Sequence, residues 1–142
     1  MARSYQLWFY GWAISVILFG VVLAGGALPQ TDAAAQLVLT LLDGPGPREF
    51  SPLVRFSLGV CGPVSMGWGI GMIGVVRVTH MIEPEPRRIL WTIFSAGVLT
   101  WFVIDSCLST ATGFGRNVIP NCLLIVGYVV PLLTSGVLGR AR

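Results

Sequence analysis

The stretch Leu99–Asn121, LTWFVIDSCLSTATGFGRNVIPN, decides the fold of this chain. It completes one long apolar segment, turns at Gly113 and Gly115, and begins a second apolar segment. Asp105 is the only acidic residue inside such a segment, and an ionisable side chain at membrane depth costs free energy unless it has a partner or a use. The stretch therefore predicts a helical hairpin in a membrane, with Asp105 as the first candidate for function.

The composition of the whole chain is that of an integral membrane protein. Of its 142 residues, 54% are hydrophobic and only 11% are charged, and the mean hydropathy is +0.79. A water-soluble domain of this size would lack the polar groups to cover its surface. Segments 7–28, 53–78, 89–112 and 118–138 each reach the roughly 20 apolar residues that span a bilayer. We expect an all-α, antiparallel four-helix transmembrane bundle that forms a single domain over residues 1–142.

A further short helix is predicted between the first two spans, over residues 33–42. Thr31 and Asp32 precede it, and either side-chain oxygen can accept a hydrogen bond from the first helical turn. The segment AAAQLVLTLL is too short to cross a membrane and lacks a basic face. We therefore expect it to lie at the outer membrane interface, followed by a proline- and glycine-rich turn region, Asp43–Pro52.

The distribution of arginine predicts the orientation. All basic residues of the chain are arginines, and the four-span topology divides them unequally. One side holds Arg3, Arg77, Arg87, Arg88, Arg140 and Arg142, and the other side holds Arg48, Arg55 and Arg116. By the positive-inside rule both termini and the Arg77–Arg88 loop are cytoplasmic. We expect a multi-pass protein of a bacterial inner membrane, and we interpret Glu83-Pro84-Glu85-Pro86 as a stiff turn within this loop.

The aromatic residues near the N-terminus, Tyr5, Trp8, Tyr10 and Trp12, are interpreted as an anchor at the headgroup level. The cysteines, Cys61, Cys107 and Cys122, match no metal-binding spacing. We expect buried thiols that fill space, with a Cys107–Cys122 disulfide as the alternative if that side is oxidising. His80 has no second ligand nearby in the sequence, so we expect a solvated side chain, and neither a metal nor a cofactor is expected.

The second span is rich in small residues, which let helix backbones approach closely where lipid supplies no hydrophobic drive for association. They are Gly59, Gly62, Ser65, Gly67, Gly69, Gly71 and Gly74. Gly67 and Gly71, like Ser65 and Gly69, have the small-xxx-small spacing of such contacts. The pattern predicts a packing helix, but its partner is left open between another helix of this chain and a different subunit.

A polar cluster is predicted at the outer end of the bundle. The topology brings Arg55, Asp105, Ser109, Arg116, Asn117 and Asn121 to this end from three spans. An ion pair of Asp105 with Arg55 or Arg116 would offset the cost of both charges, and the asparagine amides would satisfy the remaining carboxylate lone pairs. We interpret the cluster as a clasp between helices, with a ligand pocket or a subunit contact as the alternative.

The sequence offers packing surface and little chemistry, which favours a non-enzymatic function. Ser106 and Ser109 have no histidine base on their side of the membrane, and no second intramembrane acid continues a proton relay from Asp105. We expect an accessory or scaffolding subunit that contacts lipids and other transmembrane subunits, and no nucleic acid. The alternative is a small-molecule or lipid carrier that uses the cleft around Asp105. The layout is generically similar to small bacterial four-helix membrane proteins, and no motif assigns a family.

Overall fold

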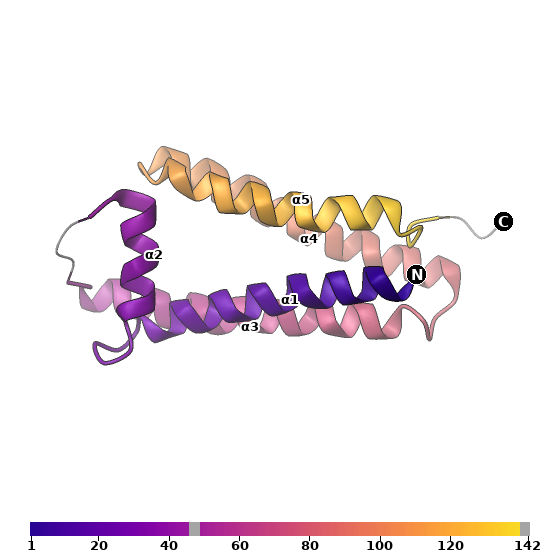
Figure 1. Ribbon diagram of the computed structural model, residues 1–142, viewed down its shortest axis with the longest axis horizontal. Coiled ribbons are helices and arrows are strands. Elements are labelled where there is room, and N and C mark those ends of the chain that lie inside the picture. The colour runs from indigo at the N-terminus through magenta and orange to yellow at the C-terminus, as the bar shows by residue number, and fades with distance from the viewer. Residues whose placement is uncertain (46–48, 140–142) are drawn as a thin grey trace. The chain divides into compact units, whose positions relative to one another are not determined.

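The computed structural model describes residues 1–45 and 49–139, and these ranges contain helices and no strand (Figure 1). The elements are α1 (Arg3–Gly25), α2 (Ala33–Asp43), α3 (Pro52–Val78), α4 (Pro84–Ala111), the 3-10 helix η1 (Gly115–Asn117) and α5 (Val118–Thr134). Of the described helices, α1, α3, α4 and the continuous η1–α5 segment are long and apolar enough to cross a membrane. The predicted all-α membrane fold, with a short helix after the first span, is confirmed. Arg48, Arg140 and Arg142, which entered the orientation argument, lie outside the described residues.

The start of α4 differs from the prediction. The helix begins at Pro84, with Glu83 as its N-cap, and not at Ile89. Pro84 and Pro86 occupy the first turn, where a helix needs no backbone N–H and where the fixed φ of proline already suits the helix. The interpretation of Glu83–Pro86 as a turn was therefore wrong, and α4 extends beyond the apolar segment.

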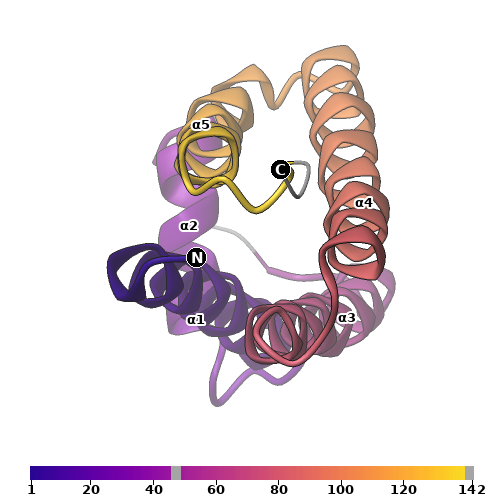
Figure 2. The same ribbon diagram turned by 90° about the vertical axis from the view of Figure 1, so that its right-hand side faces the viewer.

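The turn between α4 and α5 depends on one glycine. The N–H of Thr112 donates to the carbonyl of Leu108, and Gly113 follows with φ +89°, a conformation that side chains with a Cβ rarely adopt. Figure 2 looks along the helices and shows α4 joined to α5 at the end away from the viewer. The two helices are therefore antiparallel neighbours, as the opening stretch predicts.

The chain divides into two compact units. One consists of residues 1–13 and 71–142, of which the structure describes those up to residue 139, and the other of residues 14–70. Helices α1 and α3 each contribute one part to each unit. The expectation of a single domain stays a prediction, and each unit is described by itself.

The unit of residues 14–70 is held by close backbone contact between α1 and α3. A Cβ added to Gly62 would lie 2.5 Å from the backbone nitrogen of Ala24 and 2.6 Å from the carbonyl oxygen of Gly20. A Cβ added to Gly20 would meet the carbonyl oxygen of Gly62 at 2.7 Å. Such distances leave no room for any side chain, so glycine is required on both helices at this crossing.

The unit of residues 1–13 and 71–139 has an aromatic core. Phe9 packs on Trp91 with ring centroids 4.7 Å apart, and Trp12 packs on Tyr128 at 5.3 Å. Phe9 also meets Tyr128 edge-on at 6.0 Å, so rings from α1, α4 and α5 share one cluster. Trp91, Phe9 and Tyr128 are fully buried. Aromatic pairs in this distance range contribute about 0.5–1.5 kcal/mol beyond the area they bury.

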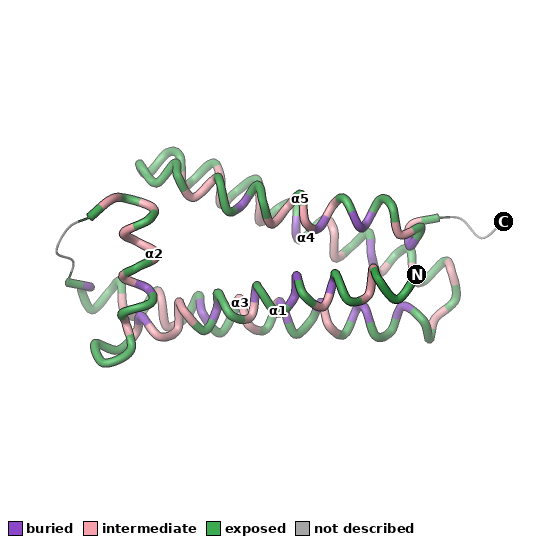
Figure 3. The backbone as a smooth tube through the Cα atoms, in the orientation of Figure 1, coloured by how far each residue is buried: buried purple, intermediate pink, exposed green. Residues whose placement is uncertain are grey.

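The outer surface of the helices is apolar. Only 11–28% of the residues in the four membrane-length windows are buried, as the sparse purple positions in Figure 3 show. Exposed leucine, isoleucine, valine and phenylalanine side chains cover the rest, for example Leu18, Phe56, Ile93 and Leu133. In a water-soluble protein such a surface would drive aggregation, and here it is the surface that contacts lipid.

Candidate functional site

Asp105 lies in a cluster of amide and hydroxyl groups between α4 and α5. Its Oδ2 accepts hydrogen bonds from Nδ2 of Asn117 at 3.0 Å and from Nδ2 of Asn121 at 2.5 Å. The same two amides donate to Ser109 Oγ at 2.9 Å and to Ser106 Oγ at 3.3 Å. We call these five residues the Asp105 cluster.

The spacing within each helix explains how the Asp105 cluster forms. Asp105 and Ser109 are one turn apart on α4, and Asn117, the last residue of η1 and the N-cap of α5, lies one turn before Asn121. Two antiparallel helices joined by a short turn bring these pairs face to face. Asn121 is only 4% exposed and Asp105 is half-buried. Two amide donors therefore satisfy the same carboxylate oxygen of Asp105.

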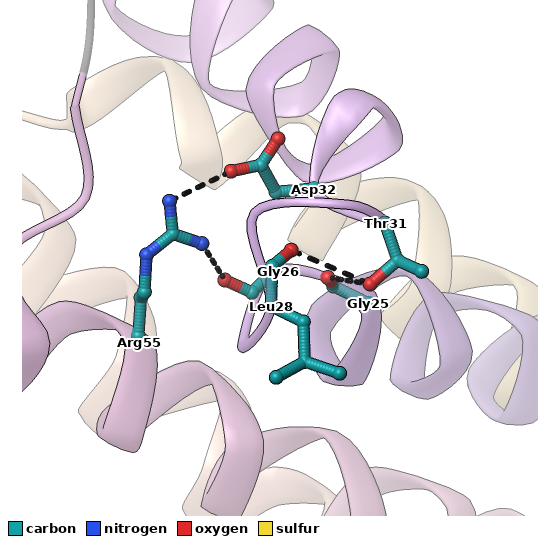
Figure 4. A network of polar contacts seen from close by, with 6 residues as sticks. All are labelled: Gly25, Gly26, Leu28, Thr31, Asp32 and Arg55. Carbon is teal, nitrogen blue, oxygen red and sulfur yellow. Dashed lines mark hydrogen bonds and ion pairs between the residues drawn. The ribbon is translucent and has the colours of Figure 1, made fainter.

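Arg55 is found in a second cluster, in the other unit (Figure 4). Its Nη2 forms an ion pair with Oδ2 of Asp32 at 2.9 Å, and its Nη1 donates to the carbonyl oxygen of Gly26 at 3.2 Å. The ring of Phe50 lies 5.4 Å from its guanidinium carbon. Arg55 therefore pairs with Asp32 rather than with Asp105, because the α1–α2 turn brings a carboxylate and a free carbonyl to the same guanidinium. We call these four residues the Arg55 cluster.

Thr31 and Asp32, which were expected to cap α2, form hydrogen bonds to other parts of the chain. Asp32 occupies the N-cap position but makes no side-chain hydrogen bond to the helix, since its carboxylate binds Arg55. The hydroxyl of Thr31 donates at 2.7 Å to the carbonyl of Gly25, at the end of α1. The helix C-terminus leaves such carbonyls without donors, so Thr31 closes α1 instead of opening α2. The capping prediction was wrong in both cases.

The indole groups of Trp8 and Trp12 bind backbone carbonyls of α5. Trp8 Nε1 donates to Gly127 at 2.7 Å, and Trp12 Nε1 donates to Leu124 at 3.0 Å. Pro131 has no N–H, so the carbonyl of Gly127 lacks its helical donor, and Trp8 supplies one from a neighbouring helix. Trp12 is 7% exposed and belongs to the core, which corrects the interpretation of this residue as a headgroup anchor.

The remaining predicted site residues are placed apart from these contacts. Arg116 is exposed in η1, and no hydrogen bond or ion pair of its side chain is found among the described residues. All cysteines, Cys61, Cys107 and Cys122, are free and exposed, so neither a disulfide nor a buried packing role holds. His80 is exposed and hydrogen-bonded to Gln6 of α1. In the described ranges no three His, Cys, Asp or Glu side chains come together as a metal would need.

The small residues of α3 divide into two groups. Gly62 contacts Ala24 of α1, and Gly59 contacts Ala27 in the turn that follows α1, so an added Cβ would meet these residues. At Gly67 in the unit of residues 14–70, and at Gly71 and Gly74 in the other unit, an added Cβ would have nothing within 4 Å among the described residues of its own unit. Two small residues of α3 belong to neither group. The hydroxyl of Ser65 donates to the carbonyl of Cys61 on the same helix, and Gly69 is buried. The structure thus separates packing within the chain from a glycine face that is open.

Comparisons with protein-family models, with curated proteins and with solved structures found no match. Both clusters and the open glycine face are consequently interpreted from their own geometry.

Proposed function

We propose that this chain is a non-enzymatic accessory or scaffolding subunit that packs against a larger complex in a bacterial inner membrane. The observation that carries the proposal is the open glycine face of α3, Gly67, Gly71 and Gly74. These positions follow i, i+4 and i+7, so they share one side of the helix. Small residues at this spacing allow another transmembrane helix to approach to backbone contact.

The use made of the polar side chains supports a scaffolding role. The carboxylate of Asp105 accepts from two asparagine amides, and that of Asp32 binds Arg55. Both clusters join helices of this chain, so their hydrogen bonds are spent on fixing the fold. What the chain offers outward is apolar surface with small residues at one face.

The proposed orientation has both termini in the cytoplasm. Arg77, Arg87 and Arg88 flank the α3–α4 turn, and the bond between Gln6 and His80 brings the start of α1 to the same end. Arginine retained on the cytoplasmic side agrees with the positive-inside rule. Single cysteines placed at Met81 and at Gly115 in a cysteine-free variant test this, since a membrane-impermeant maleimide should label only Gly115→Cys in intact cells. Labelling of Met81→Cys instead of Gly115→Cys would show that the orientation is the opposite of the one proposed.

The accessory role is tested by purification from native membranes in mild detergent, followed by native mass measurement. Gly71→Leu fills the open face and should release the co-purifying partner. Gly97→Leu is the matched control, because Gly97 of α4 also has nothing within 4 Å of an added Cβ. A monodisperse wild-type monomer without partner, or equal loss with both variants, would contradict the proposal.

A second candidate function is a carrier of a small polar molecule or lipid headgroup at the Asp105 cluster. The observation in its favour is that four polar side chains surround the carboxylate of Asp105, which is only half-buried. Against it, Oδ2 of Asp105 is already occupied by two donors. Asp105→Asn should abolish binding of such a ligand while the fold persists, and unchanged binding would exclude this candidate.

A further inference from the structure

The cytoplasmic end of the proposed orientation carries a concentration of positive charge that the scaffolding role does not use. Within the described residues it consists of Arg3, Arg77, Arg87 and Arg88. Against these stand two carboxylates, Glu83 and Glu85. In residues 1–45 and 49–139 none of the four arginines forms a salt bridge. We call these four residues the arginine end.

Three segments of one unit are fixed to each other at this end. Trp91 Nε1 donates at 2.9 Å to the hydroxyl of Thr79, which itself donates to the carbonyl of Val75. This chain of hydrogen bonds ties the first turns of α4 to the last turn of α3. The contact of Gln6 with His80 ties α1 to the same turn. The arginines therefore stand on a buried, hydrogen-bonded base and not on independent tails.

Arg87 is the least satisfied of the four. Its Nε atom is buried and has no hydrogen-bond partner among the residues that the structure describes. A guanidinium donates best through two parallel N–H groups to one phosphate or carboxylate. A small outward rotation of this side chain would let its Nε–H and one Nη–H donate to the same phosphate. The buried Nε–H would then have an acceptor.

The surface next to the charges is apolar. Ile89 and Ile93 are one turn apart on α4, directly after Arg88, with exposed fractions of 52% and 67%. A phospholipid has the same order of charged and apolar groups as this surface, because its anionic phosphate lies at the membrane surface and its acyl chains lie below. Basic residues immediately cytoplasmic of transmembrane helices attract anionic headgroups for this reason.

We propose that the arginine end binds an anionic phospholipid of the cytoplasmic leaflet, with the phosphate at Arg77, Arg87 and Arg88 and an acyl chain along Ile89 and Ile93. Glu83 and Glu85 oppose the binding by like-charge repulsion of the phosphate. The net charge of the end remains positive, so an anionic lipid is favoured over a zwitterionic one.

The test is native mass spectrometry of the full-length protein released from micelles with phosphatidylglycerol or phosphatidylcholine of identical chains. The wild type should retain phosphatidylglycerol preferentially. Arg88→Gln should weaken retention about fivefold, the value for one basic residue near a membrane surface. Arg116→Gln is the matched control, because Arg116 is also exposed but lies at the other end of its span. It should leave retention unchanged.

Two further measurements test the contribution of the opposing carboxylates and that of the acyl chain. Glu85→Gln should strengthen retention of phosphatidylglycerol, and millimolar inorganic phosphate should not displace the lipid. Equal weakening by Arg88→Gln and Arg116→Gln, equal retention of both lipids, or displacement by phosphate alone would each overturn the proposal. Circular dichroism and melting of both exposed-arginine variants confirm that the comparison is made on folded protein.

Discussion

The indole Nε1 of Trp8 donates a 2.7 Å hydrogen bond to the carbonyl oxygen of Gly127, the acceptor that Pro131 leaves without a helical donor. A proline within a transmembrane helix is tolerated where a neighbouring helix satisfies the freed carbonyl. The neighbour here is the first helix of the chain, so one side chain of α1 compensates for a residue of α5.

Trp8→Phe should destabilise the protein by about 1 kcal/mol, because the ring remains while the donor is lost. In a Pro131→Ala background residue 131 regains its N–H, and the loss caused by Trp8→Phe should shrink. Unfolding in a denaturing detergent, followed by circular dichroism, measures all four proteins of this cycle. Trp12→Phe is the control, since its acceptor at Leu124 keeps a helical donor in Tyr128, and its effect should not depend on residue 131. Additive effects of Trp8→Phe and Pro131→Ala would refute the compensation.

Gly62→Ala should destabilise the α1–α3 contact by about 1–3 kcal/mol, the usual cost of overpacking. The added Cβ would meet backbone atoms of Gly20 and Ala24, which cannot turn aside as a side chain can. Gly67→Ala on the same helix adds the same methyl group to open space and should not lower the melting temperature of the isolated chain, because alanine also favours a helix more than glycine does. Thermal unfolding in mild detergent compares the pair, and equal stability of the two variants would disprove this account of the crossing.

Asp105→Asn should retain most of the stability, because the amide oxygen of asparagine can accept from both Asn117 and Asn121. Asp105→Leu should cost about 1–3 kcal/mol, since two amide groups would then lose their acceptor in a partly buried position. Folded yield and melting temperature in detergent separate these outcomes. A destabilisation by asparagine as large as that by leucine would mean that the negative charge itself holds α4 to α5.

Arg55→Lys should destabilise the α1–α2 turn nearly as much as Arg55→Ala. The guanidinium binds two acceptors in different directions, the carboxylate of Asp32 and the carbonyl of Gly26, whereas an ammonium is a single point of contact. Exchanging the charges, Asp32→Arg with Arg55→Asp, restores the ion pair but not the donor to Gly26. The double variant should therefore remain less stable than the wild type, as measured by thermal unfolding, and full recovery would show that the ion pair alone matters.

The hydropathy pattern predicted the long helices because any helix that crosses a bilayer must be apolar over most of its length. It misjudged the start of α4, since Pro84 and Pro86 break a helix interior but suit a first turn. The turn was predicted correctly because Gly113 and Gly115 stand between two apolar segments. The predicted start of α4 was therefore wrong because proline is unfavourable in the interior of a helix and favourable in its first turn.

The clusters were predicted in part. Helical periodicity was enough to bring Asp105, Ser109, Asn117 and Asn121 together, because they lie on adjacent helices joined by a short turn. The partner of Arg55 depends on the path of the turn before α2, which periodicity does not describe. The interfacial preference of tryptophan likewise says nothing of the direction in which an indole points, so the core position of Trp12 was missed.

The contact between Trp8 and Gly127 also constrains the order in which the protein can form. The ribosome synthesises α1 before α5. The hydrogen bond from Trp8 to Gly127 can therefore form only after α3, α4 and α5 have been inserted. The aromatic core around Tyr128 also forms only at that stage, because Phe9 and Trp12 belong to α1 and Tyr128 belongs to α5. A chain arrested before α5 would leave the indole N–H groups of Trp8 and Trp12 without these carbonyl acceptors, so both contacts form only after the last helix has entered the membrane.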